Sequence, residues 1–240
     1  MTDRATDRSR FDRRSRAIDE WMDHPDADPA LLAQSLVYLR RINRLLGYVR
    51  STIKHLESLT RSLPHDRPLT VLDVGTGGAD LPEALCRWAD RRGRAIRVIG
   101  LDLHARTLTA ARRSLVDSRI ALLRGDALDL PMPDRSVDVA MCSLFLHHLD
   151  DAQVVQALRE MRRVARVGLV AGDLLRHRRA YLWIKLLTLT ANPMVRHDAP
   201  ISVLQSFRSP EIVALARQAG LPSPALHRHF GHRFVLVSRW

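Results

Sequence analysis

The sequence lacks most of the features that would place the chain outside a reducing compartment or in a membrane. It has only two cysteines, Cys86 and Cys142, and both lie in apolar periodic segments, as buried thiols do. The longest apolar run, residues 181–184, is interrupted by Lys185 and is too short for a membrane span. The N-terminus has no apolar stretch typical of a signal peptide. We therefore expect a cytoplasmic protein without a transmembrane segment.

Two further absences narrow the choice of ligand. No cysteine–histidine spacing suits structural zinc and no other metal-ligand pattern is visible, so we expect no metal. The dinucleotide fingerprint G-x-G-x-x-G needs a third glycine where the chain has Asp80. Asp73 and Asp80 also bracket the loop, and two carboxylates repel a pyrophosphate but attract a sulfonium or ammonium group. The loop therefore suits S-adenosylmethionine (SAM) better than NAD.

Carboxylates follow three predicted strands. Residues 71–80 read as a buried strand, a glycine-rich turn and the start of a helix. Asp102 ends the next apolar run, where it can accept the ribose hydroxyls of an adenosine, and Asp126 follows a third run, placed to accept from the adenine amine. Taken singly, these features are also typical of a tight turn, a helix N-cap and a stabilised turn. Together, three acidic strand ends on one sheet edge favour a ligand site.

Strand and helix patterns alternate from residue 69 onward, which implies a parallel sheet with helices on both faces. We predict strands near 69–74, 96–101, 119–124, 137–142 and 167–172, with helices near 80–92, 105–117 and 151–165. A helix near 209–220 precedes two segments, 225–230 and 233–237, that look like a closing hairpin. The predicted fold class is α/β: a Rossmann-like, doubly wound, seven-stranded sheet, mostly parallel with a C-terminal antiparallel hairpin, plus an N-terminal helical lid.

Four motifs in this order resemble those of class I SAM-dependent methyltransferases: LDVGTGGADLP, GLDLH, GDALDLPMPDRSVDVAMCS and LFLHHL. The resemblance covers roughly residues 69–240. The segments INRLLGYVRS, AGDLLRHRRAYL and VRHDAPISVLQSF are similar to the small bacterial methyltransferases often found beside type III polyketide synthases. The chain departs from the family pattern D-x-G-x-G-x-G at Ala79, whose methyl group we expect to be tolerated if position 79 lies in the helix.

The resemblance implies that SAM is the cofactor. The residues expected to bind it are Asp73, Gly75, Thr76, Gly77, Asp80, Asp102, Leu103, Asp126, Ala127 and Ser143. Arg41, Asn43 and Arg44 are placed to orient the cofactor carboxylate or an anionic substrate group.

The remaining segments are predicted to form a tail and lids. Residues 1–20 are arginine-rich and predicted to be disordered. Residues 21–66 should form an N-terminal helical lid of one long or two shorter helices, and residues 67–240 the methyltransferase domain, with a lid insertion at about 174–207. The residues expected to bind the substrate are Tyr38, Arg44, Tyr48, Tyr181, Trp183 and Met194. For the aromatic residues among them, core packing is the alternative.

Methyl transfer from a sulfonium depends mainly on in-line alignment, and a base helps if the nucleophile is a phenol. Candidate bases are His147 and His148 after the fourth strand, Asp173 after the fifth, and His197–Asp198. In a helix, neighbouring side chains point about 100° apart, so at most one of His147 and His148 should face the cofactor. His197–Asp198 is the preferred base, since it lies in a predicted irregular segment between two prolines.

The net charge of +12 is compatible with nucleic-acid binding, and RNA methyltransferases share this fold. The arginine pairs are nevertheless spread over separate predicted helices, and no Asn/Asp-Pro-Pro-aromatic element follows the fourth strand. The leading hypothesis is methylation of an oxygen, or a carbon, on a hydrophobic phenolic or polyketide-derived molecule by a monomer or homodimer. RNA or protein methylation and a non-catalytic SAM-binding role stay open. Arg176, Arg178 and Arg179 before residues 181–189 also allow weak contact with an anionic lipid surface.

Overall fold

The computed structural model describes residues 10–15, 19–24 and 26–240. Its strands are β1 (Leu69–Val74), β2 (Ile96–Asp102), β3 (Ile120–Arg124), β4 (Val137–Ser143), β5 (Ala165–Leu174), β6 (Ala225–His229) and β7 (Arg233–Arg239). Its α-helices are α2 (Pro29–Leu45), α3 (Tyr48–Thr60), α4 (Asp80–Arg92), α5 (Ala105–Ser114), α6 (Asp151–Val164), α7 (Arg178–Leu187), α8 (Pro193–Gln205) and α9 (Ser209–Gln218). Two short 3-10 helices are η1 (Trp21–Asp23) and η2 (Leu146–His148).

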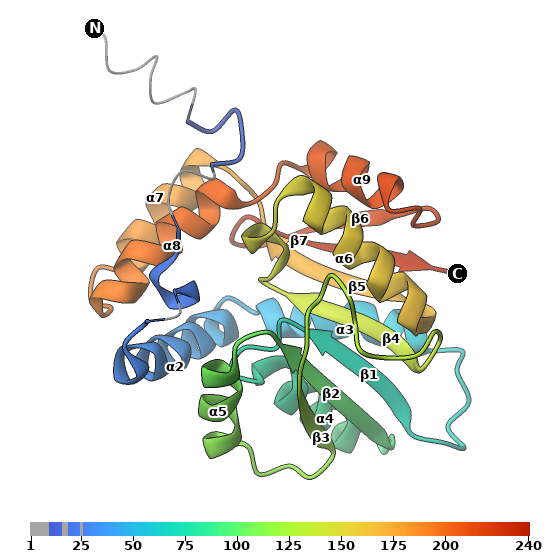
Figure 1. Ribbon diagram of the computed structural model, residues 1–240. Coiled ribbons are helices and arrows are strands. Elements are labelled where there is room, and N and C mark those ends of the chain that lie inside the picture. Colours follow the sequence, from blue (N-terminus) through green and yellow to red (C-terminus); the bar gives the residue numbers. More distant parts are fainter. Residues whose placement is uncertain (1–9, 16–18, 25) are drawn as a thin grey trace, which may run out of the picture.

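The strands form one seven-stranded sheet in the order β3-β2-β1-β4-β5-β7-β6 (Figure 1). Strands β1 to β5 pair in parallel, and β7 runs antiparallel to both β5 and β6. This confirms the predicted Rossmann-like fold class. Because β1 leads to β2 on one side and lies beside β4 on the other, the strand order switches at the carboxyl end of β1. Ligands bind at such a switch point in open α/β sheets.

Helices pack on both faces of the sheet. In Figure 1, α6 and α9 lie in front of it and α3 and α4 lie behind it. Strand β1 buries every position except Thr70, which explains why its sequence is a nearly continuous apolar run. Cys86 and Cys142 are both buried free thiols, as the sequence predicted.

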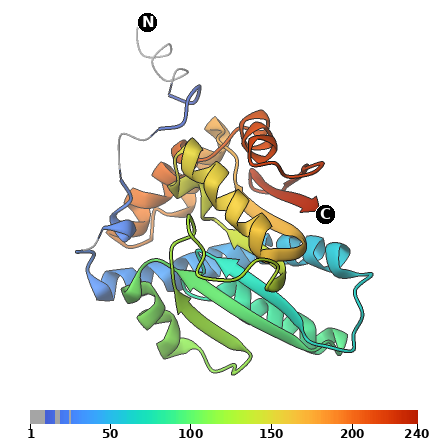
Figure 2. The same ribbon diagram turned by 45° about the vertical axis from the view of Figure 1, so that its right-hand side comes forward.

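Helices α2, α7 and α8 gather at one end of the sheet, on the left in Figures 1 and 2. The N-terminal helical segment is two helices because Gly47 takes a left-handed conformation, with φ 68°, between α2 and α3. Of the predicted lid at 21–66, only α2 and the segment before it belong to this group. Helix α3 instead buries Ile53, Leu56 and Leu59 in the core.

The described part of the N-terminal segment is packed against the domain. Phe11 is buried and meets Tyr181 edge to face, while Arg14 donates to the carbonyl oxygens of Leu149 and Gln205 at 2.7 and 2.9 Å. Glu20 is only 4% exposed. The predicted disorder of residues 1–20 is therefore wrong for residues 10–15 and 19–20, because their partners are distant in sequence. Residues 1–9 and 16–18 lie outside the described part of the chain.

Candidate functional site

The loop between β1 and α4 depends on two left-handed glycines, Gly75 with φ 68° and Gly77 with φ 53°. A Cβ on Gly75 would lie 2.4 Å from Cδ2 of Phe145, so glycine is required there by space as well as by conformation. Ala79, the N-cap of α4, is also left-handed, with φ 61°. Position 79 therefore lacks the helical angles on which the expected tolerance of its methyl group depended, and this alanine carries a strain of about 1 kcal/mol that glycine would avoid.

Gly75→Ala and Gly77→Ala form a matched pair of substitutions. Each should lower the free energy of unfolding by about 1–2 kcal/mol, since each forces an alanine into the left-handed region. Gly75→Ala should lower the free energy of unfolding by about 1–3 kcal/mol more, because its methyl group displaces Phe145. Nothing lies within 4 Å of a Cβ on Gly77, so Gly77→Ala lacks this further loss. Urea unfolding of both variants measures the difference. Equal losses would contradict the packing of Phe145 against Gly75.

Asp73 lies beneath the glycine loop and is 1% exposed. Its Oδ2 accepts a hydrogen bond from Thr76 Oγ1 at 2.8 Å, while its Oδ1 is buried and has no hydrogen-bond partner among the described residues. Burial raises the pKa of this carboxyl to about 7. A buried, unsatisfied carboxylate oxygen beside a glycine loop is suited to a ligand that carries positive charge.

Asp102 ends β2, the strand next to β1, and Asp126 follows β3, the edge strand beyond it. Asp102 is buried, and its carboxylate accepts from the backbone N–H groups of Gly77 and His104, each at 3.0 Å. Asp126 is exposed and accepts from the N–H of Leu128 at 2.9 Å. The ends of these strands thus lie on the same sheet edge as the glycine loop, as the sequence predicted. Asp102 is hydrogen-bonded directly to that loop. The other predicted cofactor residues lie beside them, with Leu103 exposed, Ala127 buried and Ser143 at the end of β4.

Asp80 has a different partner from the one expected. Nε of Arg40, on α2, donates to Asp80 Oδ1 at 2.5 Å, and Nη2 of the same arginine donates to the carbonyl oxygen of Gly78 at 3.0 Å. The charge of Asp80 is thus compensated within the protein, and the negative charge that faces the loop comes mainly from Asp73 and Asp102. Sequence reasoning did not identify Arg40, because its role depends on where α2 packs.

A cavity of about 860 Å³ lies on the other side of the loop that follows β4. Phe145 of that loop meets Gly75, whereas Leu144, His147 and His148 line the cavity. An apolar part of the remaining wall comes from α2, the residue after it, α7 and α8, through Leu39, Ile42, Leu46, Ala180, Trp183, Ile184, Leu187, Val195, Ala199 and Val203. A polar part comes from Arg176, His177, Arg208, Arg228, His229, His232 and Arg233. One short loop therefore separates the glycine loop from an apolar cavity.

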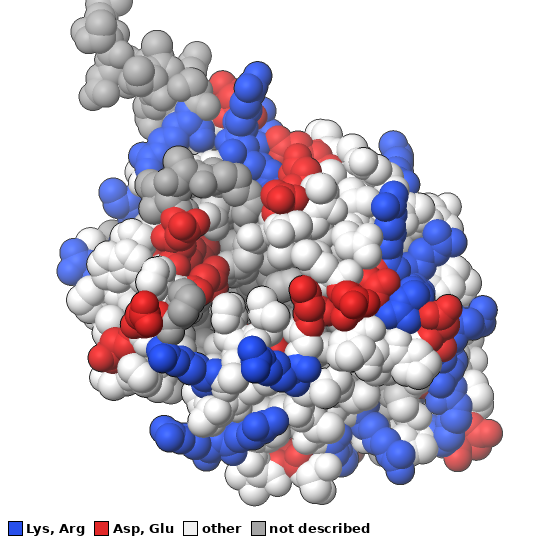
Figure 3. Space-filling view, viewed as in Figure 1, with Lys and Arg blue, Asp and Glu red and all other residues white. Residues whose placement is uncertain are grey.

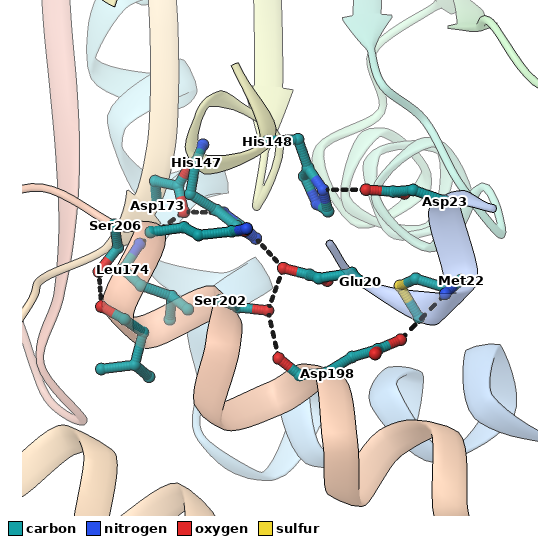
Figure 4. A network of polar contacts seen from close by, with 12 residues as sticks. Glu20, Met22, Asp23, His147, His148, Asp173, Leu174, Asp198, Ser202 and Ser206 are labelled. Atoms are coloured by element: carbon teal, nitrogen blue, oxygen red, sulfur yellow. Dashed lines mark hydrogen bonds and ion pairs between the residues drawn. The ribbon is translucent and has the colours of Figure 1, made fainter. Parts of the chain in front are cut away.

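A buried polar network occupies one wall of this cavity (Figure 4). Nδ1 of His147 lies 2.7 Å from Asp173 Oδ1, and the His147 backbone N–H donates to Asp173 Oδ2 at 3.0 Å. Nε2 of His147 lies 3.8 Å from Oε1 of Glu20. Burial by itself would raise the pKa of Asp173, but the His147 ring and the backbone donors outweigh burial and lower it. Asp173 therefore stays ionised and orients the His147 ring.

His148 differs from His147 in its charge. Its Nδ1 lies 2.7 Å from Asp23 Oδ2. Burial alone would lower its pKa, but the carboxylates of Glu20 and Asp23 raise the pKa to about 10, so the ring is protonated at neutral pH. Both rings line the cavity, with centroids 4.2 Å apart. That at most one of them faces the cofactor stays a prediction, but η2 is a short 3-10 turn and not the α-helix on which the prediction was based.

The same network brings together a set of potential metal ligands. Glu20, His147 and His148 each offer one ligand atom, and these atoms lie within 4.8 Å of one another. The sequence showed no such pattern, because Glu20 belongs to the N-terminal segment and is far from the two histidines along the chain.

His197 and Asp198 lie within α8, so the predicted irregular segment is in fact helical. The Asp198 carboxylate accepts from the N–H groups of Trp21 and Met22 at 2.8 and 3.0 Å. The His197 ring stacks on Trp21, with centroids 4.1 Å apart. This pair therefore fastens residues 19–24, which we call the strap, across the cavity.

Of the residues predicted to bind the substrate, Trp183 lines the cavity, whereas Tyr38, Arg44, Tyr48, Tyr181 and Met194 are not among the described residues that line it. Tyr48 is fully buried against Gly172, and Met194 packs in a small cluster with Ala27 and Leu32. Tyr181 contacts Phe11, and the Tyr38 hydroxyl donates to the carbonyl oxygen of Leu187 at 2.7 Å. Arg44 is exposed. Helical spacing identified Tyr48 and Met194 as inward-facing, but it does not distinguish a core from a cavity wall.

Comparisons with known proteins agree with this geometry. Residues 71–168 match the family described as "Methyltransferase domain". The 2-phytyl-1,4-naphtoquinone methyltransferase of Synechococcus elongatus is 32% identical over 215 residues, which cover 82% of this chain and 89% of that protein. The chain belongs to the class I SAM-dependent methyltransferases.

Other relatives of this methyltransferase match in part. The demethylmenaquinone methyltransferase of Roseiflexus sp. is 37% identical over 97 residues, 40% of this chain and only 38% of that relative's length. The structure of human N-acetylserotonin methyltransferase in complex with SAM has the same fold, with a TM-score of 0.64 at 14% identity over 88% of this chain and 56% of the human chain. SAM is the cofactor that fits the glycine loop, since Asp73 Oδ1 is buried without a partner there and SAM carries positive charge.

SAM affinity should depend on pH through Asp73. With a pKa of about 7, this carboxyl is mostly protonated at pH 6 and must lose its proton to attract a cation. Affinity should therefore rise about fivefold between pH 6 and pH 7 and about a further twofold by pH 8, and then level off. Calorimetric titration measures this, with Asp73→Asn as the control that should remove the dependence on Asp73. An identical pH dependence in both proteins would contradict the assignment.

Proposed function

We propose that this methyltransferase moves the SAM methyl group onto a hydroxyl oxygen of a hydrophobic aromatic molecule, with His147 as the base. The observation that carries the proposal is the apolar cavity with the His147–Asp173 pair in its wall, one loop away from the glycine loop. Phenols, hydroquinones and polyketide-derived aromatics are the acceptor classes that combine an apolar ring with an acidic hydroxyl. Two relatives named as quinone methyltransferases are consistent with such acceptors.

In this proposal, different residues bind the cofactor, align the acceptor and accept its proton. Asp73, Asp102 and Asp126 would hold the cofactor at the strand ends, and the cavity would align the acceptor ring by excluding water around it. Bound SAM supplies an electrophilic methyl group, so that an oxygen–carbon bond forms as a sulfur–carbon bond breaks. His147 takes the hydroxyl proton on Nε2, because Asp173 accepts from its Nδ1 and stabilises the imidazolium that results. His148 is already protonated and cannot take this proton.

Nucleic-acid methylation receives less support. Several arginines are engaged by carboxylates, among them Arg119 with Asp90 and Asp117 at 2.6 Å each. On the face drawn in Figure 3, Lys and Arg side chains are dispersed among acidic and uncharged ones and do not form a continuous tract. A binding groove for a polynucleotide would gather them along one path.

The test is transfer of labelled methyl groups from SAM to a panel of acceptors: simple phenols, naphthohydroquinones with and without an alkyl chain, and a structured RNA. We expect label in the hydrophobic hydroquinones or phenols, at an oxygen as located by NMR of the product. Label on a ring carbon would replace the O-methylation proposal by C-methylation. Label in RNA alone would overturn the small-molecule proposal, and SAM binding without any transfer would favour a non-catalytic role.

A further inference from the structure

Helix α7 turns its apolar side chains toward solvent. Its only buried residue is Ala180, whereas Leu182, Trp183 and Leu186 are 66%, 60% and 59% exposed. Helices on globular domains ordinarily turn such residues inward. A contiguous exposed apolar surface of this kind marks a binding site for a protein or a membrane. We call this surface the α7 face; it comprises Leu182, Trp183, Leu186, Leu187 and Leu189.

Within the segment from residue 174 to residue 207, which contains the α7 face, the exposed charges all have one sign. Between residues 174 and 207 they are Arg178, Arg179, Lys185 and Arg196, and the single carboxylate in this stretch, Asp198, is buried. Apolar side chains interleaved with cations are typical of a helix that lies in the headgroup region of an anionic membrane. A second copy of this chain fits less well, because a twofold interface would bring the Arg179 side chains of the two copies close together.

The α7 face is also continuous with the cavity. Trp183 and Leu187 are exposed and line the cavity at the same time. Phe230, in the turn between β6 and β7, lines it as well and is 81% exposed. A molecule that enters along α7 therefore meets the side chains of Trp183 and Leu187, which belong both to the α7 face and to the cavity wall.

We propose that the α7 face docks on an anionic lipid surface and opens the cavity toward it. Leu182 and Leu186 enter the boundary between headgroups and acyl chains, while Arg179 and Lys185 contact lipid phosphates. The attachment is peripheral, since none of the described helices has the length and apolar character needed to cross a membrane. The inference rests on the proposed function only in that the acceptor is hydrophobic; docking itself requires neither SAM nor acceptor.

The experiment is sedimentation of the full chain with vesicles of phosphatidylcholine, alone or mixed with phosphatidylglycerol. We expect binding to the mixed vesicles that weakens with salt, and little binding to the neutral ones. Replacing both Leu182 and Leu186 by Ser should reduce binding by about tenfold or more. Arg179→Gln and Lys185→Gln should each reduce it about fivefold. Val116→Ser removes an apolar side chain that is 95% exposed outside the lid, and this control should bind like the wild type.

Each outcome decides between alternatives. Equal binding to neutral and mixed vesicles, or unchanged binding of the Leu182→Ser, Leu186→Ser double variant, would overturn the proposal. A dimer that this double variant dissociates, together with no vesicle binding, would assign the α7 face to a second copy. Thermal melting verifies that the variants fold, and transfer to a water-soluble acceptor should be unchanged, because neither leucine lines the cavity. Vesicle binding without transfer to any acceptor would remove the proposed function and leave the docking surface intact.

Discussion

Asp102→Ala should weaken SAM binding by at least about 100-fold, because two charge-assisted hydrogen bonds from the ribose hydroxyls are lost together. The same carboxylate holds the N–H groups of Gly77 and His104, so its removal also loosens the glycine loop. Calorimetric titration with SAM and with S-adenosylhomocysteine measures the loss. Both ligands carry the ribose, and both should be affected alike.

The control for this substitution is Asp134→Ala. Asp134 has a side chain that is 74% exposed and pairs with Arg163, away from the strand ends that bear the site. Its removal should leave SAM affinity within about twofold of the wild type, since an exposed ion pair contributes little. An Asp102→Ala protein that is folded and binds SAM with wild-type affinity would refute the ribose assignment.

His147→Ala should lower kcat by about 100-fold to 10,000-fold while leaving SAM affinity nearly intact, because the ring acts on the acceptor proton and not on the cofactor. Asp173→Asn should also lower kcat, since an amide in place of the carboxylate no longer orients the His147 ring or stabilises its protonated form. The rise of kcat with pH that a base produces should disappear in His147→Ala. Single-turnover rates over a range of pH, with SAM affinity measured separately, test these expectations.

His197→Ala provides the matched comparison. Its ring stacks on Trp21 and does not line the cavity, so kcat should change much less than in His147→Ala. A large loss in His197→Ala with normal turnover in His147→Ala would restore the sequence-based preference and remove His147 as the base.

The cofactor half of the site could be predicted from the sequence because its determinants are local. Residues 71–80 contain the strand, the turn and the helix start, and the alternation of strands and helices places Asp102 and Asp126 on the same edge. The sequence could not show that Asp73 and Asp80 differ in their hydrogen-bond partners, since both flank the loop. Only the packing of α2, which brings Arg40 to Asp80, distinguishes a compensated carboxylate from an unsatisfied one.

The acceptor half was harder to predict because its contacts join distant segments. His147 and Asp173 were both candidates, but nothing local indicates that they form a pair. The first two residues of the strap were assigned to a disordered tail by composition, although Glu20 is buried beside His147. Aromatic residues at helical spacing were assigned to the cavity, and of these Trp183 lines it, whereas Tyr38, Tyr48 and Tyr181 do not. Periodicity shows which side of a helix faces inward, but not whether protein or ligand fills the space.

Helix α2 contacts both halves of the site. Leu39, Ile42 and Leu46 form part of the cavity wall, while Arg40, on the same helix, holds Asp80 and the Gly78 carbonyl of the glycine loop. Any displacement of α2 by one ligand therefore changes the free energy of binding the other. Such linkage is reciprocal: the factor by which SAM changes acceptor affinity equals the factor by which acceptor changes SAM affinity. An acceptor that fills the cavity fully should thus retain the methyl donor longer than one that fits loosely.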